Sequence, residues 1–190
     1  MAEKNYCIIQ SGDAYYVPIK AEFNPYPGHE SEKAYLACLP NFFGGARERG
    51  ENFYEGIARE VREESAGKIN ISTAVYERGQ WKRLYQYRQY TFYLVTLSDR
   101  VEYFGGNLCD LSGMAEKPAE KEMSCILKIP VDNDLRGKSF DSFLERCKQI
   151  GGDFVNINPR NPDGSDNNSL TQWKTHEGTK DAFKELLGLQ

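Results

Sequence analysis

Three glutamates, Glu60, Glu63 and Glu64, form the densest group of chemically useful side chains in this sequence. Because a helix turns by about 100° per residue, side chains at this spacing project from one face. Like charges on one face destabilise an isolated helix, and a doubly charged cation between them would relieve the repulsion. Mg²⁺ prefers hard oxygen ligands and commonly bridges a few carboxylates to substrate phosphates. The spacing therefore indicates a magnesium site that serves phosphate chemistry.

The residues around this acidic face have the types that would position it. Gly44 and Gly45 permit a sharp turn from the apolar run 34–43 into the helix. Ile57 and Val61 form an apolar arc beside the acidic one. We therefore expect one flank of the helix to pack and the other to face solvent or a ligand. The alternative is a solvated, charge-laced helix, since Glu and Arg at such spacings are common on exposed helices.

Together, positions 45 to 64 follow the pattern G-x5-E-x7-R-E-V-x-E-E. This pattern resembles the signature of the Nudix hydrolase superfamily, and fixed spacings of this kind are far more specific than a lone glycine motif. The family motif continues to Gly67, but it has glycine where this chain has Ala66. Alanine can remain helical where glycine would cap, so the departure bears on the helix terminus more than on the metal site.

The resemblance implies a fold, a reaction and a set of residue roles. It implies an α/β/α sandwich, with a mixed β-sheet flanked by helices in one domain over residues 1–190. It also implies hydrolysis of a phosphoanhydride bond in a nucleoside diphosphate linked to another moiety, with Mg²⁺ as cofactor and Mn²⁺ as a substitute. The roles carried over are metal ligation by Glu60, Glu63, Glu64 and the carbonyl of Gly45, and fixing of the motif geometry by a pair between Arg59 and Glu51.

The resemblance does not settle which carboxylate accepts the proton of the attacking water. Family members use either a motif glutamate, here Glu60 or Glu63, or an acid on a distant loop. The distant candidates are Glu116, Glu120 and Glu122, and among them we assign Glu120. A charged, solvent-exposed loop is the alternative interpretation for each of these three acids.

The substrate class is suggested by one aromatic residue. Tyr85 lies 18 residues beyond Gly67. A tyrosine near this distance resembles the subgroup that hydrolyses dinucleoside polyphosphates, whereas the ADP-ribose subgroup has a proline at a similar distance, where this chain has Lys82. We therefore assign Tyr85 to nucleobase binding. Aromatic side chains on strands belong to the core more often than to a site, which is the competing interpretation.

Two other functions fit the same resemblance. The first is a non-catalytic Nudix-fold module that senses a nucleotide. Such modules usually lose motif glutamates, and this chain retains them, which favours the enzyme. The second is the isomerase branch of the superfamily, which uses a cysteine and a glutamate; Cys38 lies upstream of the motif, without that branch's surrounding sequence.

Composition restricts the class of protein and its partners. A chain of 190 residues with 39% hydrophobic residues can build a single core. The net charge of −4 disfavours binding to nucleic acid or to an anionic membrane, so the expected partner is a small nucleotide substrate, with a homodimer left open. No stretch approaches the length of a membrane span or a signal peptide, and the cytoplasm is expected.

The cysteine pattern gives a further expectation. The five cysteines are odd in number and never form C-x-x-C, which predicts neither a disulfide framework nor a zinc site and suggests a reducing compartment. They are Cys7, Cys38, Cys109, Cys125 and Cys147.

Hydrophobic periodicity and turn residues predict the remaining elements. We expect a hairpin of strands 6–10 and 14–20, strands over 34–39, 69–76, 84–97 and 125–130, helices around 140–147 and 183–187, a long loop over 105–121 and a surface loop over 157–169.

Overall fold

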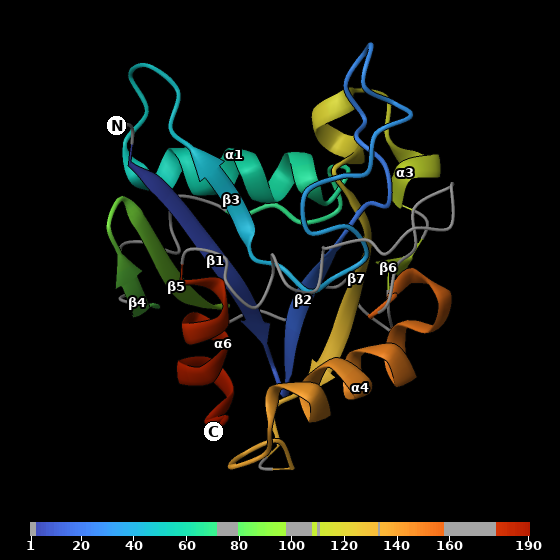
Figure 1. Ribbon diagram of the computed structural model, residues 1–190. Helices are drawn as coiled ribbons and strands as arrows, with labels where there is room; N and C mark the ends of the chain where they lie inside the picture. Colours follow the sequence, from blue (N-terminus) through green and yellow to red (C-terminus); the bar gives the residue numbers. More distant parts are fainter. Residues whose placement is uncertain (1–2, 72–79, 98–107, 110, 133, 158–177) are drawn as a thin grey trace.

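The computed structural model describes residues 3–71, 80–97, 108–109, 111–132, 134–157 and 178–190 (Figure 1). The chain begins with the expected hairpin, in which β1 (Lys4–Ser11) and β2 (Ala14–Lys20) pair antiparallel. The turn between them places Gly12 at φ +59°, a conformation that glycine adopts without strain. The hairpin prediction is confirmed.

Within the described residues, the strands form one mixed, seven-stranded sheet in the order β4-β5-β1-β2-β7-β6, with β3 paired to β1. β1 runs parallel to β5 and antiparallel to β2 and β3. The further strands are β3 (Phe43–Ala46), β4 (Trp81–Tyr87), β5 (Tyr90–Leu97), β6 (Leu108–Cys109) and β7 (Met123–Pro130).

One edge of β1 is shared between two partners, and this division opens the sheet. Residues 9–11 pair with β2, whereas residues 4–7 pair with β3. β1 and β2 therefore diverge from their common turn, and the fork between them opens towards α1 (Figure 1). The segment that leads into β3 crosses the fork, because Lys20 N–H donates to the carbonyl of Leu39 and Asn41 N–H donates to that of Pro18.

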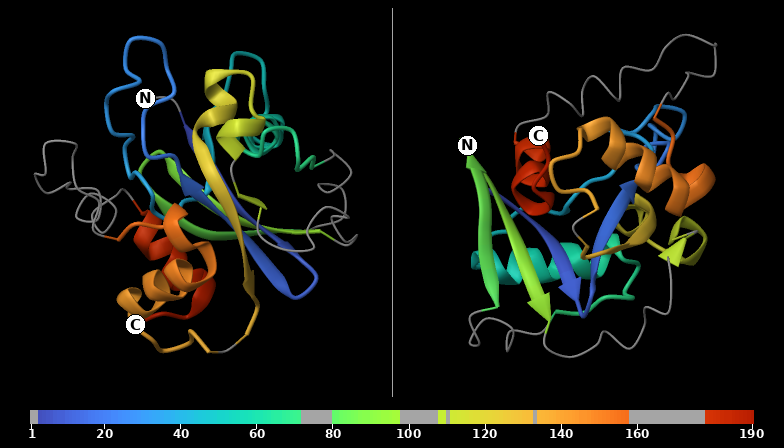
Figure 2. Two further views of the ribbon diagram at one scale, coloured as in Figure 1. Left: turned by 90° about the vertical axis from the view of Figure 1, so that its right-hand side faces the viewer. Right: turned by 90° about the horizontal axis from the view of Figure 1, so that it is seen from below.

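Alternating side chains on the strands build a core on each face of the sheet. Ile8 belongs to the core under α4 (Phe140–Gly151) and α6 (Thr179–Leu187), whereas Ile9 belongs to the core under α1 (Phe53–Glu64). The left view of Figure 2 shows α1 on one side of the sheet and the other two helices opposite. The predicted α/β class is confirmed. No helix in the described residues is long and apolar enough to cross a membrane.

The motif helix α1 starts at a complete capping box. The side chain of Asn52 accepts hydrogen bonds from the backbone N–H groups of Tyr54 and Glu55, and Glu55 accepts one from the N–H of Asn52. These bonds satisfy donors that the helix itself leaves without partners. Ile57 and Val61 are buried against the sheet, as the apolar arc predicts, so the acidic face of α1 points away from that core.

The end of α1 corrects the expectation for Ala66, which leaves the helix at φ +49°. Its N–H donates to the carbonyl of Glu63 at 2.9 Å, and Gly67 N–H donates to that of Arg62 at 2.7 Å. This pair of bonds is a Schellman motif, whose left-handed position favours glycine. Backbone hydrogen bonding therefore overrides the helix propensity of alanine, and α1 ends at Glu64.

Several predicted elements differ from the observed ones. Residues 34–39 form turns and not a strand, because Leu36 and Cys38 have φ of 61° and 58°; the strand that enters the motif is β3. The strand predicted over 84–97 is the hairpin of β4 and β5, with Arg88 at φ 52° in its turn.

Other predictions fall partly outside the described residues. Within 105–121, the described part contains β6, α3 (Leu111–Met114) and the 3₁₀ helix η1 (Pro118–Lys121), so it is not a plain loop. Residues 69–71 are not in a strand, and 72–76 lie outside the description, as does the surface loop 157–169 beyond residue 157. The helices predicted around 140–147 and 183–187 are confirmed as α4 and α6, and η2 (Gly152–Phe154) follows α4.

The left-handed position of Ala66 predicts that Ala66→Gly stabilises the protein by about 1 kcal/mol, because glycine adopts positive φ without a steric penalty. In a domain of this size that corresponds to a rise in Tm of about 2–4 °C, measured by thermal denaturation. The control is Ala58→Gly in the interior of the same helix, which should destabilise by about the same amount. An Ala66→Gly variant that melts at or below the wild-type temperature contradicts this account of the helix end.

Candidate active site

Arg59 joins the acidic helix to the loop before it. Its Nε donates to Oε1 of Glu51 at 2.8 Å, and its Nη2 donates to the carbonyl of Ala46 at 3.2 Å. The expected pair of Arg59 and Glu51 is therefore confirmed. The bond from Arg59 is the main cause of a lowered pKa of Glu51. Through these contacts the loop after β3 is fixed to α1.

The same guanidinium also balances two carboxylates of the acidic face. Nη1 of Arg59 donates to Oε1 of Glu60 at 3.1 Å and to Oε2 of Glu63 at 3.0 Å. Burial raises the pKa of Glu60, and the charge of Arg59 opposes this effect. A Cβ atom on Gly45 would lie 2.7 Å from Oε1 of Glu60, so any other residue here would displace this carboxylate.

Glu64 is the most enclosed of the three acids, with only 3% of its surface exposed. Its Oε2 accepts a hydrogen bond from the N–H of Gly44 at 2.8 Å. A Cβ atom on Gly44 would overlap the carbonyl oxygen of Asn5 on β1, and its φ of +137° also favours glycine. Burial raises the pKa of Glu64 well above its usual value, and the charge of Lys20 partly opposes the shift.

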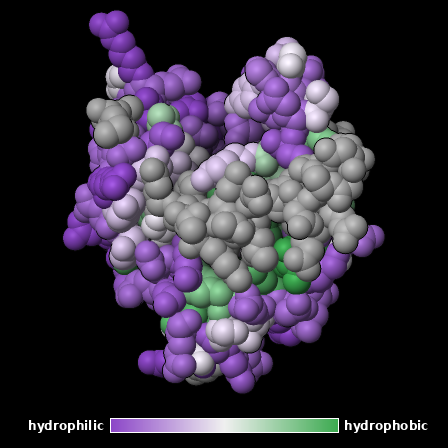
Figure 3. Space-filling view, viewed as in Figure 1, coloured by the Kyte–Doolittle hydropathy of each residue, from purple (hydrophilic) through white to green (hydrophobic). Residues whose placement is uncertain are grey.

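These acids line a cavity of about 940 Å³ at the fork between β1 and β2. Among the residues that the structure describes, five carboxylates and three cationic side chains face it: Glu48, Glu60, Glu63, Glu64, Glu122, Lys4, Lys20 and Arg59. Figure 3 shows that the surface on both sides of the notch at the upper edge of the molecule is largely hydrophilic. Gly45 lines the cavity too, whereas Glu51 does not and acts through Arg59. A cavity of this size can hold a nucleotide with a second group attached.

The wall opposite the motif carries a cluster of Lys20, Tyr26 and Glu122, of which only Glu122 was considered from the sequence. Lys20 Nζ lies 2.5 Å from Oε2 of Glu122, and the hydroxyl of Tyr26 donates to Oε1 of Glu122 at 2.5 Å. Burial alone would raise the pKa of Glu122, but the charge of Lys20 and the two hydrogen bonds hold it below its usual value. Lys20 and Tyr26 lie far from the motif in sequence, and no local pattern distinguishes them.

Glu120 does not line the cavity, which corrects its assignment as the distant acid. Its Oε2 accepts hydrogen bonds from the backbone N–H groups of Glu116 and Lys117 at 3.1 and 3.3 Å. These bonds lower the pKa of Glu120 and show that it caps the 3₁₀ helix. Of the three acids considered on this loop, Glu122 is the one that faces the cavity.

Tyr85 is not among the cavity residues, which removes the observation behind its assignment to a nucleobase. It lies on β4 and packs against the core under α6, where a Cβ on Gly178 would be 3.3 Å from its ring. Burial and a hydrogen bond with Asp181 raise its pKa. The interpretation as a packing residue is therefore the better one. Four other tyrosines line the cavity: Tyr6, Tyr26, Tyr35 and Tyr90.

Cys38, the residue behind the isomerase alternative, also lies outside this cavity. It lines a separate cleft of about 530 Å³ beside Phe23 and Phe154, and burial raises its pKa to about 11. A thiol with a raised pKa outside the carboxylate cavity does not support cysteine-based proton transfer there.

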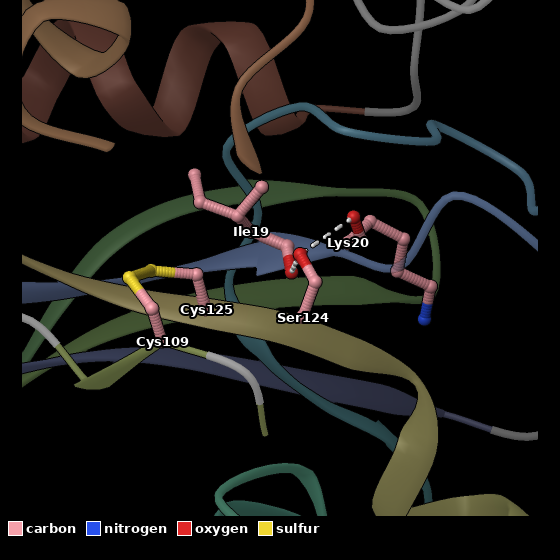
Figure 4. Close-up of a disulfide and its surroundings, with 5 residues drawn as sticks. All are labelled: Ile19, Lys20, Cys109, Ser124 and Cys125. Atoms are coloured by element: carbon pink, nitrogen blue, oxygen red, sulfur yellow. Dashed lines mark hydrogen bonds between the residues drawn. A yellow bond between two sulfur atoms is a disulfide. The ribbon is translucent and has the colours of Figure 1, made fainter. Parts of the chain in front are cut away.

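Cys109 and Cys125 form a disulfide between β6 and β7, contrary to the expectation of no disulfide. Figure 4 shows this bond beside Ser124. Sequence spacing could not reveal it, because strand register places the two cysteines opposite one another. Cys7, Cys38 and Cys147 are free and buried.

The donor chemistry of the motif suits Mg²⁺, since carboxylate and carbonyl oxygens are its preferred protein ligands. In the described part of the chain, however, no three His, Cys, Asp or Glu side chains are grouped to hold an ion. Arg59 contacts both Glu60 and Glu63 in this arrangement. A metal ion bound at these carboxylates would therefore have to replace Arg59 as the partner of at least one of them.

The burial of Glu64 predicts that Glu64→Gln raises the Tm of the metal-free protein at neutral pH. Because folding raises this pKa, the protonated carboxyl stabilises the fold below the unfolded value of about 4.5, and that contribution is lost as pH rises through the folded value. Glutamine removes the charge and keeps an acceptor for Gly44 N–H. We expect a gain of a few degrees at pH 7.5 that shrinks as the pH falls towards 4.5, measured by scanning calorimetry in EDTA.

Glu63→Gln serves as the control, since Glu63 is 28% exposed and lies on the same helix. This variant should change the Tm less than Glu64→Gln does. A lower Tm for Glu64→Gln at pH 7.5 would show that the buried charge of Glu64 does not destabilise the folded protein.

No protein-family model matches this chain, and searches of curated proteins and of solved structures give no match.

Proposed function

We propose that the chain is a metal-dependent hydrolase with a Nudix-type fold, which cleaves a phosphoanhydride bond in a nucleoside diphosphate linked to another moiety. One observation carries the proposal: Glu60, Glu63, Glu64 and Gly45 line a single polar cavity, and Arg59 ties Glu60 and Glu63 to Glu51 on the loop before the helix. A solvated charged helix would not need this set of contacts at once. The glycines that accommodate Glu60 and Glu64 add to the argument.

In this proposal the three motif glutamates and the carbonyl of Gly45 hold Mg²⁺ or Mn²⁺. When bound, the ion supplies charge neutralisation for the phosphates under attack. Arg59 keeps the loop and helix in register through Glu51 and Ala46. Gly44 N–H orients the carboxylate of Glu64. The chain itself therefore provides preorganised oxygen ligands on a packed helix.

The reaction needs an acceptor for one proton of water. The water oxygen forms a bond to phosphorus while the bond from phosphorus to the bridging oxygen breaks, and the leaving phosphate takes that electron pair. Glu120 is engaged in a local cap and both oxygens of Glu122 are held by Lys20 and Tyr26. A motif glutamate, Glu60 or Glu63, is therefore the better proton acceptor than an acid of the loop.

The alternative is a Nudix-fold module that binds a nucleotide without cleaving it. Degenerate modules usually lose motif carboxylates, and this chain retains Glu51 and the three acids of α1. The enzyme is therefore favoured. The isomerase alternative loses support because Cys38 lies outside the cavity. The dinucleoside polyphosphate subgroup was suggested by Tyr85 alone. Because Tyr85 lies outside the cavity, the structure does not support this substrate class.

The proposal is tested by a screen of nucleoside diphosphate derivatives with Mg²⁺, scored for released monophosphate. For any substrate found, Glu63→Gln should lower kcat by about 100-fold or more, because it removes a charged group that acts in the transition state. Its Tm should stay close to that of the wild type.

Glu55→Gln is the matched control, since this residue lies on the same helix and outside the cavity, and glutamine preserves the capping box. It should retain wild-type kcat. Tight nucleotide binding without turnover in the wild type would favour the sensor, and full activity of Glu63→Gln would remove the motif from the reaction.

A further inference from the structure

Lys20 is the cation whose position in the cavity is most firmly fixed outside the motif. The backbone N–H of Lys20 donates to the carbonyl of Leu39 at 3.1 Å, and the backbone carbonyl of Lys20 accepts from Cys38 N–H at 3.0 Å. The pairing of β2 with β7 is irregular between Ile19 and Lys20, and Ser124 Oγ reaches both of their carbonyls, at 3.4 and 3.5 Å (Figure 4). The backbone of Lys20 is thus held from both neighbouring segments.

The side chain is held as well, but its donors are not exhausted. Lys20 is 16% exposed and its Nζ contacts Glu122, whose second oxygen is held by Tyr26. An ammonium group has three N–H donors. Within the residues that the structure describes, Glu122 is the one acceptor that contacts Nζ. A largely enclosed ammonium with remaining donors is suited to an anionic ligand.

The surroundings indicate which anion fits. Lys20 shares the cavity with the motif acids, and it is close enough to Glu64 for its charge to oppose the raised pKa of that acid. Arg59 also lines the cavity, but Glu51, Glu60 and Glu63 already accept its hydrogen bonds. A phosphate next to the acidic face would therefore find a charged hydrogen-bond donor in Lys20.

We propose that Lys20 binds the second phosphoryl group of a diphosphate whose first phosphoryl group lies at the acidic face of α1. Glu122 and Tyr26 act as positioning residues that hold the ammonium in place. This inference rests on the proposed function and assigns one of its two linked phosphates to a residue outside the motif. It also explains why Glu122 faces the cavity while both of its oxygens are engaged.

The test compares two ligands by calorimetry in the presence of Mg²⁺: α,β-methylene-ADP, which has two phosphoryl groups and a bond that resists cleavage, and AMP, which has one. The wild type should bind the methylene analogue more tightly than AMP. Lys20→Met should weaken binding of the analogue by about 10- to 100-fold, as expected for a lost charged hydrogen bond, and abolish its preference over AMP.

Lys33→Met is the matched control. Lys33 is 13% exposed, pairs with Glu22 and lies outside the cavity, so it matches Lys20 in side-chain burial and in having a glutamate partner. It should bind both ligands as the wild type does. Since Lys20→Met leaves Glu122 without its counter-charge, the double variant Lys20→Met/Glu122→Gln keeps the test valid if the single variant is unstable. It should show the same loss of preference.

The results distinguish an incorrect role for Lys20 from an incorrect hydrolase function. If the wild type hydrolyses diphosphates and Lys20→Met, or the double variant, keeps the wild-type preference for the analogue over AMP, the role of Lys20 is overturned and the proposed function stands. If the wild type binds neither ligand and hydrolyses no diphosphate derivative, both are overturned.

Discussion

Charge balance among the carboxylates of the cavity is the constraint on which this structure depends. Five acids face the same space, and burial raises the pKa values of Glu60 and Glu64. Arg59 meets part of this demand, because one guanidinium contacts both Glu60 and Glu63. Among the described residues, the acids nevertheless outnumber the cationic side chains that line the cavity. In the function proposed above, a divalent cation would offset this excess of enclosed negative charge.

Packing around two glycines converts this charge arrangement into a shaped site. The fork between β1 and β2 makes room, and β3 lies at its open end, where it pairs with residues 4–7 of β1. Gly44 and Gly45 let β3 approach both β1 and the carboxylates of α1 without a clash. Because α1 also packs against the sheet through Ile57 and Val61, the acids are held on a rigid support.

Much of the motif region could be predicted from the sequence because its interactions are local. The acidic face of α1 and the bond between Arg59 and Glu51 depend on residues at most eight positions apart. Ala66 shows the limit of this reasoning. Its helix propensity favours a longer helix, but the backbone hydrogen bonds that end α1 place it at positive φ. The turns over 34–39 likewise defeat a strand prediction made from apolar residues alone.

The second wall of the cavity could not be predicted, because it depends on contacts between distant segments. Lys20 and Glu122 are separated by 102 positions and meet through the pairing of β2 with β7. The disulfide between Cys109 and Cys125 could not be predicted for the same reason, because it depends on the register of β6 and β7. The assignment of Tyr85 to a nucleobase rested on local spacing alone. Its distance from the motif matched the dinucleoside polyphosphate subgroup, but β4 places its side chain against α6.

The most direct test of a metal site on α1 is a crystal structure with Mn²⁺, located by its anomalous scattering. The account predicts an ion among the carboxylates of Glu60, Glu63 and Glu64, with Arg59 released from Glu60 or Glu63 and still bonded to Glu51. An acidic face with no ion at saturating Mn²⁺, and with Arg59 still on both glutamates, would contradict it.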